Sequence, residues 1–271
     1  MRYRSRSVFV PVLAIILGTT VLASAQAAPR NAKDAYERGM NLITGTGVNR
    51  NEVEAVEYFR RSAEGGFAAA QTVLGYLYET GTVVPNDLRL AASWYEKAAA
   101  QDDHLAQWVL GRMYLAGQGL VADRNAAMRW LRPSAEAGNP FAALLLGEAE
   151  EVLGAPSAVP WYRKAAEQGL PEAQVRLGKL LAGGSVGAPN KYDAYVWLLI
   201  AFQNGRTDVS DDVKRLEPDL GAAKVEQAKT EARALRNETR RSVVSNGCTG
   251  WPGEFDDRPA TPPAQIQPMC R

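Results

Sequence analysis

Apolar residues recur at helical spacing in successive stretches of the chain. One stretch carries them at i, i+4, i+7 and i+8, namely at Ala70, Leu74, Leu77 and Tyr78. The next carries them at Leu90, Ala91, Trp94, Tyr95 and Ala98. This spacing places each set on one face of an α-helix, so the pattern predicts a pair of amphipathic helices joined by the polar segment between them.

The pair is repeated along the chain. A glycine in the middle of the first helix recurs at intervals of 36, 36, 36 and 31 residues, at Gly39, Gly75, Gly111, Gly147 and Gly178. An aromatic residue of the second helix keeps nearly the same phase, at Tyr58, Trp94, Trp130, Trp161 and Trp197. The small residues would let two helices approach closely, and we expect the aromatic residue to fill the space left between them. The chain therefore predicts five copies of one two-helix unit.

Three recurring motifs are similar to those of the Sel1-like repeat family, a relative of the tetratricopeptide repeat. They are the centre of the first helix (LGYLY, LGRMY), a Gly-x-Gly loop at residues 45–47 and 117–119, and WYEKAA or WYRKAA in the second helix. The resemblance covers roughly residues 34–205. It implies an all-α fold, an α-solenoid of about five helix-turn-helix repeats over 28–205, and a protein that binds other proteins without a chemistry of its own.

The first 27 residues resemble a signal peptide. Arg2, Arg4 and Arg6 precede an apolar run from Val8 to Ala23, and small residues follow. We expect cleavage after residue 25 or 27 and a periplasmic or secreted protein. The alternative is an uncleaved anchor, but the run is shorter than the ~20 residues of a membrane span.

Charge argues against two classes of partner. Removing residues 1–27 takes away three arginines and no acid, so 31 basic and 30 acidic residues become 28 and 30. A near-neutral chain lacks the concentrated basic face that nucleic acid or an anionic membrane requires. We expect no nucleic acid, no stable membrane span after cleavage, and a monomer that binds protein partners.

Asparagine or aspartate stands seven residues before most of the aromatic anchors. These residues are Asn51, Asp87, Asp123 and Asn190, and they are expected to cap the second helix of each repeat. The fourth repeat lacks this cap and is five residues shorter, with Pro156 and Pro160 just before Trp161. Because proline suits only the first turn of a helix, we expect that helix to begin near Ser157.

After the repeats, residues 206–242 read as capping helices. A short helix is expected from Ser210, and a longer one from Pro218. Residues 243–271 are rich in proline and are expected to form a flexible tail. The tail holds the two cysteines of the chain, Cys248 and Cys270, which an oxidising compartment would bridge within one chain or between two.

No cofactor or metal site is expected. The single histidine, His104, follows Asp102 and Asp103, but no further ligand cluster is apparent, and acids before a helix are ordinary caps. The Gly-x-Gly loops lie between helices and lack the additional glycine or lysine of a phosphate-binding loop.

The tetratricopeptide resemblance implies a concave groove lined by the first helix of each repeat. By that resemblance the groove residues lie three before, one after and four after each central glycine. They are Tyr36, Met40, Ile43, Thr72, Tyr76, Glu79, Trp108, Arg112, Leu115, Leu144, Glu148, Glu151, Val175, Lys179 and Ala182. The predicted partner-binding residues are Tyr76, Trp108, Arg112, Glu148, Glu151 and Lys179, since aromatic residues and arginine dominate interfaces. Two alternatives stay open: Trp108 packs on its neighbouring repeat, and the acids of the fourth repeat form a solvated face.

The leading functional prediction is an exported scaffold or adaptor for protein–protein interaction, without enzymatic activity. Two alternatives remain. One is a cell-envelope protein that binds or weakly hydrolyses β-lactams or peptidoglycan, as some secreted Sel1-like proteins do, although those carry a disulfide in each helix pair and the repeats here contain no cysteine. The other is a regulator that holds a sensor domain or an envelope assembly factor.

Overall fold

A computed structural model describes residues 30–184 and 189–245 of the chain. Within these ranges the protein forms helices and turns, with no strand. Ten helices make the five repeats: α1 (Ala32–Thr44), α2 (Glu52–Glu64), α3 (Ala68–Thr80), α4 (Leu88–Ala99), α5 (His104–Ala116), α6 (Arg124–Glu136), α7 (Pro140–Glu151), α8 (Ala155–Glu167), α9 (Pro171–Gly183) and α10 (Lys191–Gln203). A 3₁₀ turn (Thr207–Val209), α11 (Ser210–Leu220) and α12 (Ala222–Ser245) follow. The predicted signal peptide and both cysteines lie outside the described residues.

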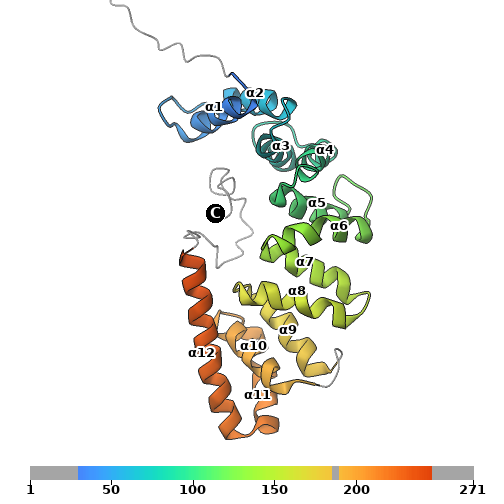
Figure 1. Cartoon of the computed structure of the whole chain (residues 1–271), viewed down its shortest axis with the longest axis vertical. Helices are drawn as coiled ribbons and strands as arrows, with labels where there is room; N and C mark the ends of the chain where they lie inside the picture. The colour runs from blue at the N-terminus through green and yellow to red at the C-terminus, as the bar shows by residue number, and fades with distance from the viewer. Residues whose placement is uncertain (1–29, 185–188, 246–271) are drawn as a thin grey trace, which may run out of the picture.

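The helices stack in sequence order into a curved solenoid (Figure 1). Each helix of α1 to α10 packs mainly against the helix before it and the helix after it. In Figure 1, α1, α3 and α5 lie on the inner side of the curve, and α2, α4 and α6 on the outer side. The all-α solenoid expected from the sequence is confirmed.

Close approach at the central glycines holds the two helices of a repeat together. A methyl group on Gly75 would lie 2.8 Å from the Tyr95 ring, and one on Gly111 would lie 2.5 Å from Leu131. The same relation joins Gly39 to Phe59, Gly147 to Tyr162 and Gly178 to Leu198. These partners are among the largest fully buried side chains of the described chain. Only glycine permits this packing, because any side chain would push the helices apart.

The residue that fills this space is not the aromatic anchor predicted from the sequence. It is the next residue along the chain, Tyr95 in place of Trp94, and its counterparts in the other repeats. Trp94 is half-buried, packs against the hydrophobic cluster of α1 to α3, and carries the Lys97 ammonium 3.8 Å above its ring. Trp94 therefore packs against the preceding repeat, whereas Tyr95 fills the interior of its own repeat.

Capping follows the sequence prediction. The side chains of Asn51, Asp87, Asp123 and Asn190 accept bonds from backbone N–H groups in the first turns of α2, α4, α6 and α10. Three buried glutamines cap the C-terminal ends of second helices, those of α2, α4 and α8. Each donates from Nε2 to a carbonyl in the last turn of the preceding helix, Gln71 to Ala63, Gln107 to Ala99 and Gln174 to Ala166, over 3.0, 3.2 and 3.2 Å. Successive repeats are thus joined by hydrogen bonds as well as by apolar contact.

The fourth repeat corrects one prediction. Helix α8 begins at Ala155, before the expected start near Ser157, and Pro160 lies inside it. Pro156 occupies the first turn, where its missing N–H costs nothing. Pro160 lies in the second turn, so its missing N–H removes only one bond, and the helix continues through it.

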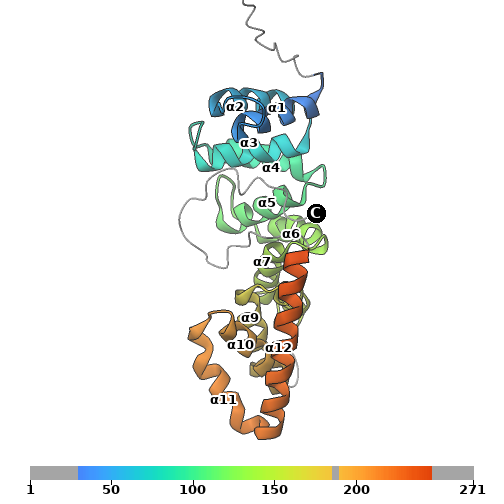
Figure 2. The same ribbon diagram turned by 90° about the vertical axis from the view of Figure 1, so that its left-hand side faces the viewer.

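The C-terminal end is closed by α11 and α12. Pro218 lies inside α11, and the long helix begins after Gly221, so the predicted start at Pro218 was wrong. Both views show α12 beside α10, running back towards the earlier repeats (Figures 1 and 2). Arg236 of α12 donates to the Gln203 carbonyl and to Asn204, each over 2.8 Å, which ties α12 to the end of α10.

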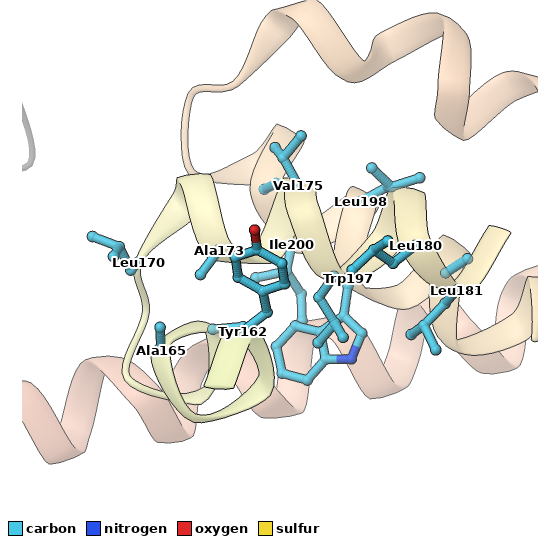
Figure 3. Close-up of a cluster of buried hydrophobic side chains, with 14 of the residues drawn as sticks. Tyr162, Ala165, Leu170, Ala173, Val175, Leu180, Leu181, Trp197, Leu198 and Ile200 are labelled. Atoms are coloured by element: carbon cyan, nitrogen blue, oxygen red, sulfur yellow. The ribbon is translucent and has the colours of Figure 1, made fainter. Parts of the chain in front are cut away.

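The cap changes the packing of the last repeat. Trp197 of α10 is buried, 6% exposed, whereas Trp94 and Trp161 of earlier repeats are half-buried. It lies in one cluster with Tyr162, Leu181 and Ile200 (Figure 3). Because α12 packs on α10, both faces of α10 are covered, which explains why eight consecutive residues of this helix, from Ala194 to Ala201, are buried.

Candidate partner-binding surface

The first helices of the repeats carry one stripe of partly exposed side chains, and α1, α3 and α5 lie on the inner side of the curve (Figure 1). Tyr76 and Glu79 of α3, Trp108 and Arg112 of α5, and Glu148 of α7 are all half-buried. Lys179 of α9 is exposed. The predicted partner-binding residues, including the half-buried Glu151, therefore all keep some exposed surface on the first helices of the second to fifth repeats.

The predicted stripe is wrong at several positions. The residue three before the central glycine is buried in three repeats, at Thr72, Leu144 and Val175, which are 7%, 9% and 3% exposed. Ile43 of α1 is also buried. These side chains belong to the core because that position turns towards the neighbouring helix. In α9, Arg176 beside Val175 is half-buried at the surface and was not among the predicted residues.

Two of the acidic residues on this stripe are held by tyrosines from the second helices. The Tyr95 hydroxyl donates to Glu79 over 2.8 Å, and the Tyr162 hydroxyl donates to Glu151 over 2.5 Å. Burial is the main cause that raises the pKa of both phenols, and the neighbouring carboxylate adds to it. Both tyrosines therefore remain protonated donors at physiological pH.

Two positions are matched in residue type within a repeat. One is the residue of the second helix that packs on the central glycine, and the other is the residue four positions after that glycine. Where the second helix supplies a tyrosine, the first helix supplies a glutamate four residues after its glycine. Where the second helix supplies Phe59 or Leu131, the first helix supplies Ile43 or Leu115. Glu79 and Glu151 thus have a structural partner within their own repeat, in addition to any role at the surface.

Ion pairs connect the stripe to neighbouring parts of the solenoid. Arg112 of α5 pairs with Glu79 of α3. Lys179 of α9 lies 3.7 Å from Asp212 of α11. Both predicted cationic residues therefore already contact an acid, and the energy of each surface pair is small, about 0–1 kcal/mol. A partner could replace these pairs at little cost.

Trp108 packs on its neighbouring repeat, as one of the two alternatives for this residue holds. Its ring lies 5.5 Å from that of Phe141 on α7, so it packs on the next repeat. It is still half-buried, and its indole N–H is buried without a hydrogen-bond partner. Phe141 was not predicted as part of this surface. It stands one residue before Ala142, a core position.

The family of the chain follows from these repeats. A family model described as Sel1 repeat matches residues 32–67, 68–103, 104–139, 156–170 and 171–205. The chain belongs to the Sel1 repeat family. Sel1 repeat proteins are known as scaffolds for protein–protein interaction, and their fold is typically non-enzymatic. The shortest match falls on the fourth repeat, where the loop between the two helices is cut down.

Two solved Sel1-type structures resemble the chain. A protective antigen of uropathogenic Escherichia coli strains, which displays an SLR fold, is 28% identical with a TM-score of 0.65 over 80% of this chain. The chain spans 50% of that antigen's length. A Sel1 repeat protein from Oxalobacter formigenes is 26% identical with a TM-score of 0.59, covering 75% of this chain and 88% of that one. No curated protein matches the sequence.

The other candidate groups have structural roles in the Sel1 array. His104 begins α5, and its Nδ1 lies 3.0 Å from Oε1 of Gln107, the glutamine that caps α4. Among the described residues, no three histidine, cysteine or acidic side chains are grouped as metal ligands. No helix within the described ranges is long and apolar enough to cross a membrane.

Proposed function

We propose that the protein is an exported scaffold that binds a protein partner along the inner stripe of its Sel1 repeats. The observation that carries the proposal is the stripe itself. Tyr76 of α3 and Trp108 and Arg112 of α5 are half-buried, and both helices lie on the inner side of the curve (Figure 1). Aromatic residues and arginine contribute most of the energy of many interfaces, and here the scaffold holds them in place before binding.

Export rests on the N-terminal pattern. We expect the mature protein to begin at Gln26 or Ala28 and to be found in the periplasm or secreted. Intact-mass spectrometry of the protein from fractionated cells tests this directly. A protein that retains Met1 in the membrane fraction would contradict export of a cleaved form.

Partner binding is tested by two substitutions within the stripe. The protein is cross-linked to its partner in the native envelope and recovered. Arg112→Ala and Trp108→Ala are expected to lower the yield of the cross-linked complex at least tenfold, since each removes a side chain of the hot-spot class. Arg89→Ala, which changes an exposed arginine of α4, is the matched control and should leave the yield unchanged.

The melting temperature of each variant separates binding from folding. Arg112→Ala removes one surface ion pair and an exposed hydrogen bond to Gln118, and should melt within about 2 °C of the wild type. Trp108→Ala also loses the contact with Phe141 and is expected to melt lower, so its capture is measured well below its melting temperature. Normal capture by both folded variants would exclude the stripe as the binding surface.

A further inference from the structure

Three side chains from three helices form a connected line that runs from the core to the surface. The Tyr95 hydroxyl of α4 donates to Oε2 of Glu79 on α3 over 2.8 Å. The other carboxylate oxygen of Glu79, Oε1, pairs with Nη2 of Arg112 on α5. One carboxylate therefore receives a tyrosine of its own repeat and an arginine of the next repeat, each on a separate oxygen.

Exposure increases along this line. Tyr95 is 1% exposed, whereas the side chains of Glu79 and Arg112 are 19% and 33% exposed. The Tyr95 ring is held by its packing on Gly75, where a methyl group would lie 2.8 Å from it. Its hydroxyl is therefore a fixed point for the carboxylate. Hydrogen bonds to an ionised carboxylate are also stronger than neutral ones, which favours a single arrangement of the three groups.

Arg112 is held from a second side as well. Its Nη1 donates to Oε1 of Gln118, in the loop between α5 and α6, over 3.0 Å. With one terminal nitrogen on Glu79 and the other on Gln118, the plane of the guanidinium group is set. A guanidinium group carries more N–H donors than these two contacts use. A partner can therefore bind the remaining donors and need not displace Glu79.

The fourth repeat has the same three residue types in a looser arrangement. Tyr162 donates to Glu151 over 2.5 Å, but Arg176 lies 3.8 Å from that same carboxylate oxygen. Arg176 is closer to Glu148 and Glu172, at 3.3 Å from each. Several carboxylates thus place Arg176, whereas the orientation of Arg112 depends on one carboxylate that is attached to a buried tyrosine.

We propose that Tyr95 and Glu79 are positioning residues that hold Arg112 in the orientation in which it binds the partner. This inference rests on the proposed function, because it concerns the same surface. Without the Tyr95 hydroxyl, Glu79 and Arg112 stay paired with each other but lose their attachment to the core, so the pair moves more widely. The partner must then order the arginine itself, and the cost of that ordering weakens binding.

The first test measures the motion of Arg112 without a partner, by nuclear magnetic resonance of the isotopically labelled protein. The order parameter of the Arg112 Nε–H bond is expected to be about 0.8 in the wild type and below about 0.6 in Tyr95→Phe. Glu79→Gln should lower it too, because an amide has one acceptor oxygen for two donors. The matched control is Tyr195→Phe, which loses a bond of 3.1 Å to Glu217 of α11 and should leave Arg112 unchanged.

The second test connects this motion to binding, with the cross-linked complex recovered from the native envelope well below the melting temperature of each variant. Tyr95→Phe is expected to lower the yield about fivefold, the effect of ordering one side chain, and Tyr195→Phe should not change it. An unchanged order parameter in Tyr95→Phe would overturn the proposal, and so would normal capture by that variant once its Arg112 is mobile. Normal capture by Arg112→Ala would instead overturn the proposed function itself.

Discussion

Tyr95→Ala is expected to lower the free energy of unfolding by about 3–5 kcal/mol, the range for removing a large buried aromatic ring. Tyr95 is 1% exposed, and its ring lies directly against the backbone of α3 at Gly75. The cavity would open between α3 and α4, where the ring packs on Gly75. Since domains are stable by about 5–15 kcal/mol, the loss is severe. Urea unfolding followed by circular dichroism measures it.

Two variants show which part of the side chain is responsible. Tyr95→Phe keeps the ring and removes only the hydrogen bond to Glu79, so we expect a loss of about 1 kcal/mol. Trp94→Ala removes a larger but half-exposed side chain and should cost less than Tyr95→Ala. An equal or greater loss for Trp94→Ala would contradict the assignment of Tyr95 to the interior of the repeat.

The sequence was sufficient for the architecture because each determinant is local and recurs once per repeat. The glycine period sets the number of helix pairs, and the apolar spacing sets which face of each helix is buried. Asn51, Asp87, Asp123 and Asn190 mark helix starts because an Asx side chain there satisfies free N–H groups. These features do not depend on how one repeat sits on the next.

The sequence was not sufficient where two adjacent residues could each fill the same space between the helices. Trp94 and Tyr95 are adjacent aromatic residues about 100° apart around the helix, and either could have faced Gly75. The close approach of the helices decides it, since the Tyr95 ring takes the place where a methyl group on Gly75 would lie, 2.8 Å from it. Periodicity alone cannot supply that distance.

The inner surface was predictable only in part, because some of its residues follow from their spacing to the central glycine and others depend on how the repeats pack together. Counting from the glycine found Tyr76, Arg112 and Glu148, which lie on the exposed stripe. It did not find Phe141 or Arg176, because their place there depends on the angle between successive repeats. Arg176 could have been noticed from its spacing four residues after Glu172, which is an ordinary helical ion pair.

Gly119→Ala is expected to lower the free energy of unfolding by about 3 kcal/mol or more, through two effects that can be separated. Gly119 lies in the loop between α5 and α6 with φ of +71°, a region where a side chain is strained by about 1–3 kcal/mol. A methyl group there would also lie 2.2 Å from the carbonyl oxygen of Leu88, the first residue of α4. The loop would have to move away from the preceding repeat.

Gly47→Ala separates the two effects. Gly47 holds the same place in the loop between α1 and α2, with φ of +69°, but a methyl group on it would meet nothing within 4 Å. It should therefore show the backbone strain alone, about 1 kcal/mol. The difference between the two variants in urea unfolding measures the contact between one repeat's loop and the helix of the repeat before it. Equal losses would mean that this loop does not pack on α4, and that neighbouring repeats are joined by their helices alone.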